Sequence, residues 1–302
     1  MVGFFFKQVW SIAEATVKKF MQEAAFTQSA SIAFYTIFSL PGILIIIIRV
    51  AGVIFETATV KQELVQRANV LLGYNASLSI QNMIEQVEID KGSSFAILVG
   101  VAVLIFSATT VFTIIQEVLN KIWLVKAKPK RGWVKYLRDR AFSFIMILIL
   151  GFLMALAIVL DFLVVIFRQF IDKLLPLNFA YFYSFIGFLI SFLITLLIFT
   201  LLFKILPDAK IKWRDVSVGA FFTTALFTGG KYLIGLYLSI SNFSNTYGAA
   251  GAIILIMLWI NYSSMIMLMG ATFTQVYTKH LGRIIQPSKN AVHIVLKEIE
   301  IE

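Results

Sequence analysis

The sequence predicts an all-α polytopic membrane protein with six transmembrane helices, an N-terminal amphipathic interfacial helix and a short helical cap between spans 1 and 2. Composition is the first indication, because 60% of the 302 residues are hydrophobic and 14% are charged, whereas a soluble domain has roughly 25% charged residues. The second is a series of six long apolar stretches, and the third is the distribution of Lys and Arg among their connections. Together they exclude a water-soluble domain.

Residues 1–28 are predicted to form an amphipathic helix. Phe6, Trp10, Ala13 and Val17 recur at three- and four-residue steps, and polar residues occupy the opposite face. We expect a helix over 4–25 that lies in the membrane interface or packs on the polar end of the bundle.

Six stretches are long enough for spans, since crossing a hydrocarbon core takes about 20 apolar helical residues. The predicted spans are 29–56, 95–119, 141–167, 180–203, 216–240 and 250–277. Residues 57–94 carry two short helical patterns, broken at Gly73, and are predicted to form a helical cap on the outer side. Residues 278–302 are predicted to be a polar cytoplasmic tail.

Lys and Arg alternate between the two sides of this topology. Nineteen of the 26 lie in the two terminal segments and in the connections after spans 2 and 4, and five lie in the opposite connections. Cytoplasmic loops carry the excess of basic residues, so both termini are predicted to be cytoplasmic. Topology therefore explains the net charge of +10, and no nucleic acid is expected as a partner. The same basic loops are candidates for binding anionic headgroups of membrane lipids.

Charged residues inside the spans are candidates for a substrate pathway, because a charge in the bilayer core is costly and faces the protein interior or a wet cavity. Arg49 and Asp161 lie about seven and six residues from the outer ends of their spans, or ~10 and ~9 Å deep. We expect either that these two residues form an ion pair or that each reaches the outer headgroups independently. Lys231 is expected near the same cavity, together with the polar side chains of Asn261 and Ser263.

Two further groups of residues have predicted roles. Gln116, Glu117 and Asn120 form either a polar inner gate facing the sixth span or a surface on which Glu117 bridges the lysine one turn later. Helix packing or hinge roles are expected of one proline and three glycines. These are Pro41, Gly248, Gly251 and Gly270.

Short motifs spread over residues 29–275 resemble those of the YihY/BrkB family of bacterial inner-membrane proteins. The motifs are Phe38-Ser39-Leu40-Pro41, Asn120-Lys121-Ile122-Trp123, Leu206-Pro207-Asp208, Trp213-Arg214-Asp215, Tyr247-Gly248-Ala249-Ala250-Gly251-Ala252 and Leu268-Met269-Gly270-Ala271. The resemblance implies a multi-pass protein of the inner membrane. Members are variously labelled ribonuclease BN-like or virulence factors.

Three functions are compatible with these observations. A transporter or flippase of an anionic, lipid-like amphiphile would contribute to envelope integrity and needs a polar cavity reaching the bilayer midplane. A structural scaffold with a basic cytoplasmic face would have a tightly packed apolar bundle. The ribonuclease is disfavoured, because the chain has no Cys and only two His, and nuclease chemistry requires converging metal ligands or acid–base groups. We therefore expect no enzyme activity, catalytic residue, cofactor or metal.

Overall fold

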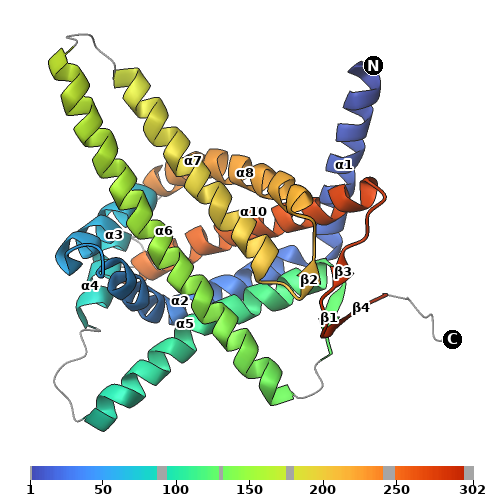
Figure 1. The fold of residues 1–302 in the computed structure, drawn as a ribbon, viewed down its shortest axis with the longest axis horizontal. Coiled ribbons are helices and arrows are strands. Elements are labelled where there is room, and N and C mark those ends of the chain that lie inside the picture. The colour runs from blue at the N-terminus through green and yellow to red at the C-terminus, as the bar shows by residue number, and fades with distance from the viewer. Residues whose placement is uncertain (1, 87–93, 129–131, 175–179, 241–248, 296–302) are drawn as a thin grey trace.

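The computed structural model describes residues 2–86, 94–128, 132–174, 180–240 and 249–295, and consists almost entirely of helices. Long helices cross one another in a bundle, two short helices cap one end and small strands lie at the other end (Figure 1). The helices are α1 Val2–Gln22, α2 Ala25–Ala51, α3 Thr57–Leu72, α4 Tyr74–Gln86, α5 Ser94–Ile122, α6 Gly132–Leu174, α7 Ala180–Ile205, α8 Trp213–Ile240 and α10 Ala249–His280.

The six predicted spans correspond to α2, α5, α6, α7, α8 and α10. Within the described part of the chain, four segments are long and apolar enough to cross a membrane, and α5 and α8 are further long apolar helices. The four segments are Ala25–Ala51, Tyr136–Phe167, Phe182–Ile205 and Gly251–His280.

Two predicted boundaries differ from the structure. The first span was expected over 29–56, but α2 ends at Ala51, after which the chain turns and the Val53 N–H donates to the Val50 carbonyl, only three residues back, at 3.3 Å. The third was expected over 141–167, but α6 runs from Gly132 to Leu174. Polar residues can continue a helix beyond its apolar run, because the backbone hydrogen bonds do not require apolar side chains.

The segments outside the spans are also helical where helices were expected. α1 covers the predicted N-terminal helix, and α3 and α4 form the cap with their break at Gly73. Gly73 has a φ of 84°, a conformation that glycine adopts without a Cβ clash. We call the part of the molecule formed by α3 and α4 the cap end.

Short strands occupy the opposite end, which we call the strand end. β1 Val125–Ala127 pairs antiparallel with β4 Ala291–His293, and β2 Ala209–Lys210 pairs antiparallel with β3 Gln286–Pro287. The segment 278–302 was predicted only as a polar tail. Part of it instead ties back to the bundle, and the carbonyl of Leu124 accepts the N–H of Ile294 at 2.8 Å.

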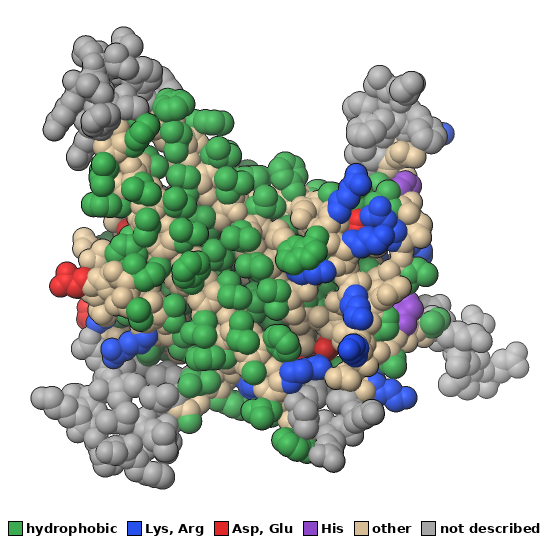
Figure 2. Space-filling model, viewed as in Figure 1, with side chains coloured by type: hydrophobic (Ala, Val, Ile, Leu, Met, Phe, Trp, Pro, Cys, Tyr) green, Lys and Arg blue, Asp and Glu red, His purple; other side chains and the backbone are tan. Residues whose placement is uncertain are grey.

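The core follows the buried faces of α2, α5, α8 and α10. One cluster of buried residues includes Leu119, Trp123, Phe203 and Leu268 and lies toward the strand end, and a second joins α2, α6 and α10 to the cap. Hydrophobic side chains also cover much of the outer surface, whereas Lys and Arg gather at the strand end (Figure 2). Such an apolar exterior is expected of a protein surrounded by lipid.

α8 and α10 approach each other through two reciprocal Gly–Thr contacts. A Cβ atom added at Gly270 would lie 2.8 Å from Thr223 Cβ, and one added at Gly219 would lie 2.9 Å from Thr274 Cβ. Real Cβ atoms do not approach this closely, so the contact requires glycine on one helix at each point. The threonine hydroxyls bond within their own helices, for example from Thr223 Oγ1 to the Gly219 carbonyl at 2.7 Å.

Candidate functional site

A polar cavity of about 390 Å³ opens between α3, α7 and α8. Lys231 of α8 lines it together with the ion pair between Arg67 Nε and Glu63 Oε1 of α3, whose atoms are 2.7 Å apart. Thr228 of α8 and hydroxyl residues of α7 complete the polar lining. These groups carry a net charge of +1, from two cations and one carboxylate.

The cavity reaches the middle of α7. Ser191 and Thr195 lie one turn apart on the same face of that helix, and Ser191 is ~17 Å from its first residue and ~21 Å from its last at 1.5 Å per residue. Thr195 Oγ1 donates to the Ser191 carbonyl at 2.8 Å. This internal bond satisfies the hydroxyl proton, so Thr195 can occupy a long apolar helix at little cost.

Lys231 is partly buried, and its Nζ lies 5.3 Å from the ring centre of Tyr232. Within the described part of the chain, no carboxylate forms an ion pair with it. The residue directly before it, Gly230, packs against α10, where an added Cβ would lie 2.8 Å from Ile266 Cδ1. Close packing on that side directs the lysine toward α3 and α7.

The other predicted pathway residues do not line this cavity. Arg49 is exposed in the last turn of α2, and the side chain of Asp161, in α6, lies outside the described residues, so their pairing stays a prediction. Asn261 Oδ1 accepts the Ser29 hydroxyl at 3.2 Å and joins α10 to α2. The hydroxyl of Ser263 is buried without a hydrogen-bond partner among the described residues.

The proline and glycines predicted as hinges have separate surroundings. Pro41 lies within an unbroken α2, and the Ser107 hydroxyl of α5 donates to the nearby Phe38 carbonyl at 2.8 Å. α5 thus bonds to the backbone of α2 about one turn before the proline. Gly270 makes the contact with α8 described above, Gly251 is buried in the first turn of α10, and Gly248 lies outside the described residues.

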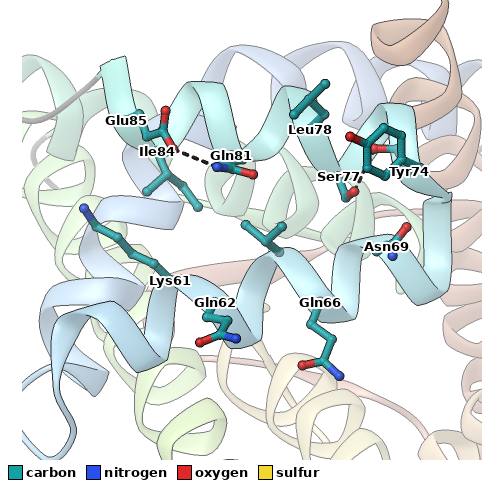
Figure 3. A pocket seen from close by; sticks show the side chains of 11 residues that line it. Lys61, Gln62, Gln66, Asn69, Tyr74, Ser77, Leu78, Gln81, Ile84 and Glu85 are labelled. Carbon is teal, nitrogen blue, oxygen red and sulfur yellow. Dashed lines mark hydrogen bonds between the residues drawn. The ribbon is translucent and has the colours of Figure 1, made fainter.

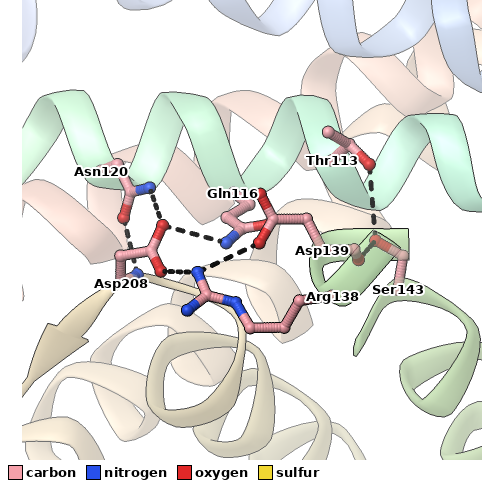
Figure 4. Close-up of polar contacts among 7 residues, drawn as sticks. All are labelled: Thr113, Gln116, Asn120, Arg138, Asp139, Ser143 and Asp208. Carbon is pink, nitrogen blue, oxygen red and sulfur yellow. Dashed lines mark hydrogen bonds and ion pairs between the residues drawn. The ribbon is translucent and has the colours of Figure 1, made fainter. Parts of the chain in front are cut away.

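At the strand end, Asp208 is the centre of a buried polar network (Figure 4). Its Oδ2 accepts Asn120 Nδ2 at 3.1 Å and Gln116 Nε2 at 3.3 Å, and its Oδ1 lies 2.9 Å from Arg138 Nη2. The backbone N–H of Asp208 donates to Asn120 Oδ1 at 2.8 Å. The network joins α5 to the start of α6 and to the connection between α7 and α8.

The predicted inner-gate residues are therefore divided between two faces of α5. Gln116 and Asn120 are buried and bind Asp208, whereas Glu117 is exposed. Glu117 is about 100° from Gln116 around the helix, and the structure leaves its side chain on the exposed side of α5. Within the described residues, no ion pair joins Glu117 to Lys121 either. Asp208 was missed as a site residue because its partners are 70 to 92 positions away in the sequence.

Two other polar contacts hold the strand end together. Arg283 forms an ion pair with the buried Asp215 of α8. Lys19 Nζ of α1 donates a hydrogen bond to Gln275 Oε1 of α10 and lies 3.2 Å from Glu23 Oε1. Burial lowers the pKa of Lys19 and raises the pKa of Glu23, and the attraction between the two charges opposes both shifts.

Comparison with known proteins identifies the family. The sequence model of virulence factor BrkB matches residues 16–293. The chain belongs to the BrkB family. UPF0761 membrane proteins of Azotobacter vinelandii and Pseudomonas paraeruginosa are 27% and 31% identical over 180 and 181 residues. The matched regions cover 57% of this chain and 40% of each relative. No solved structure matches the chain significantly.

This BrkB-family chain is thus an integral membrane protein, and the segments that carry the family resemblance meet in its fold. Asn120 of one motif binds Asp208 of another. Trp123 Nε1, in the same motif as Asn120, donates to the carbonyl of Ala271 at 3.1 Å, which links that motif to a third one in α10. The described BrkB-family motifs therefore include contacts that close the strand end.

Proposed function

We propose that this protein is a transporter or flippase that moves an anionic, lipid-like amphiphile across the bacterial inner membrane and so contributes to envelope integrity. The observation that carries the proposal is the position of Lys231 in a polar cavity halfway along α7. A polar cavity at this depth is expected of a transporter, and it contrasts with the tightly packed apolar bundle expected of a scaffold.

The chemistry of the cavity favours an anionic headgroup. Lys231 and Arg67 provide two positive charges, and Glu63 neutralises one of them. A phosphate or carboxylate next to Lys231 would supply a counterion that the described residues lack. The acyl chains of the same molecule would lie along exposed apolar side chains next to the cavity, such as Phe188, which is one turn from Ser191 on α7 and 43% exposed.

We also propose that the strand end faces the cytoplasm, that both termini lie on that side, and that its basic loops contact anionic lipid headgroups. The gathering of Lys and Arg at this end supports the proposal (Figure 2).

We propose no enzyme activity. In the described part of the chain, no group of three or more His, Cys, Asp or Glu could hold a metal ion. The buried Asp208 and Asp215 are engaged with arginines. Incubating the purified protein with tRNA precursors and divalent cations is therefore expected to yield no cleavage.

A reconstitution experiment tests transport. The protein is placed in liposomes with fluorescent phosphatidylglycerol, and lipid that leaves the inner leaflet is quenched from outside. Lys231→Gln is expected to slow the exchange about tenfold, while Lys18→Gln, an exposed lysine on α1, leaves it unchanged. Wild-type protein that exchanges lipid no faster than empty liposomes would refute the proposal, and so would equal effects of the two substitutions.

A further inference from the structure

A second cavity, of about 510 Å³, lies between the two helices of the cap. Asn69 and Gln81 lie between α3 and α4, with Tyr74 and Ser77 at one end of the groove (Figure 3). Lys61 and Glu85 lie at the other end. We call this cavity the cap groove.

Six of the eleven residues that line the cap groove carry an amide or hydroxyl group, which donates and accepts hydrogen bonds at the same time. Four of its residues are amides: Asn69 and Gln81 lie between the two helices, whereas Gln62 and Gln66 project from the side of α3 that faces away from α4 (Figure 3). Each amide side chain offers two N–H donors and a carbonyl acceptor. The bond from Gln81 Nε2 to Glu85 Oε1, at 2.8 Å, uses only one donor of that amide.

Charge and aromatic character narrow the class of ligand. The charges of Lys61 and Glu85 cancel, so the groove has no net charge to attract a phosphate on its own. Tyr74 is 70% exposed, which leaves its ring face open at the rim. Amides around a neutral groove with an open tyrosine ring match a hydroxyl-rich saccharide, whose hydroxyls also donate and accept, and whose C–H faces pack on aromatic rings.

The cap groove adjoins the cavity of Lys231. Gln66 lines both cavities, and it projects from the side of α3 that faces away from α4 (Figure 3). One molecule could therefore place a saccharide in the groove and an anionic group beside Lys231, with α3 between them.

We propose that the cap groove binds the saccharide headgroup of the transported amphiphile, which makes the substrate an anionic glycolipid. This inference rests on the proposed function for the role of Lys231, but the groove's preference for a saccharide can be measured without transport.

Native mass spectrometry of the whole chain in a detergent without sugar groups tests the preference. The two probes are glucuronosyl diacylglycerol and phosphatidic acid with the same acyl chains, so that both are anionic and only one carries a saccharide. We expect about tenfold tighter binding of the glycolipid. Asn69→Leu should abolish that difference while leaving phosphatidic acid binding unchanged, and Gln81→Leu serves as a second variant.

The matched control is Asn82→Leu, which makes the same chemical change at an exposed position of α4 outside the groove. It should leave the preference intact. Equal affinity of wild-type protein for the two lipids, or equal losses in Asn69→Leu and Asn82→Leu, would overturn the inference. If methyl glucoside competes with the glycolipid, the groove also binds a free saccharide. If it does not compete, the groove binds only lipid-linked sugar. Either outcome supports the inference only when the wild-type protein prefers the glycolipid.

The inference and the proposed function can fail separately. If Lys231→Gln slows lipid exchange while Asn69→Leu leaves glycolipid binding unchanged, transport stands and the saccharide site falls. If the saccharide preference depends on Asn69 but no lipid is exchanged, the groove is a binding site and the transport proposal falls.

Discussion

Replacing Asn120 by alanine should destabilise the strand end strongly, because two hydrogen bonds to Asp208 are lost in a buried site. The bond to the carboxylate contributes about 1.5–3 kcal/mol and the bond from the backbone N–H about 1 kcal/mol. The backbone N–H of Asp208 is then left without its acceptor. We expect a loss of about 2.5–4 kcal/mol in the free energy of unfolding.

Asp208→Ala should cost a comparable amount, because Gln116 and Arg138 lose their acceptor together with Asn120. Breaking a buried ion pair typically costs about 3–5 kcal/mol. Arg138 retains a contact with Asp139 at 3.3 Å, which places the expected loss at the lower end of this range.

A double-mutant cycle separates the contact from general damage. The two single variants and the double variant are unfolded with SDS in mixed micelles, and helical circular dichroism reports the equilibrium. Asn120 and Asp208 should be coupled by at least about 1 kcal/mol, as expected for residues in one hydrogen-bond network. Glu117→Ala on the exposed face of α5 should show coupling to Asp208 below about 0.5 kcal/mol. Equal coupling in the two cycles would refute the network as described.

Two further predictions concern packing and orientation. Gly270→Ala should lower the free energy of unfolding by about 1–3 kcal/mol, because the added methyl group meets Thr223. Thr223→Gly in the same chain should recover part of this loss, measured by SDS unfolding. If nothing is recovered, the clash lies elsewhere. Because the chain has no cysteine, Lys18→Cys and Asn82→Cys each introduce a single thiol. A membrane-impermeant maleimide should label only Asn82→Cys in intact cells, and the reverse pattern would invert the topology.

The helices were predictable because each long apolar run is a local property of the chain. All six runs coincide with helices, and the cap was visible from its two short periodic patterns and Gly73. Helix ends were harder to predict. α6 extends through polar residues on both sides, since composition marks where lipid begins and not where backbone hydrogen bonding stops.

The site was only partly predictable, because its contacts join residues far apart in the sequence. The rarity of charge inside apolar runs drew attention to Lys231, which does line a cavity. The same reasoning grouped Glu117 with Gln116 and Asn120, although the structure exposes Glu117 and buries the other two. Asp208 resembled an ordinary charged residue in a basic connection, and its role emerges only when α5 and the α7–α8 connection are brought together.

The position of Asp208 also bears on how the Lys231 cavity can change shape. α7 and α8 flank that cavity, and the connection between them carries Asp208. Separating the two helices at the strand end would break bonds from Asn120 and Arg138 and leave buried donors unpaired. At the other side of the cavity, the ion pair of α3 joins Arg67 to Glu63 of the same helix, so this pair is not broken when α3 moves away from α7 and α8. The cavity consequently opens at lower cost toward the cap end, where the cap groove lies.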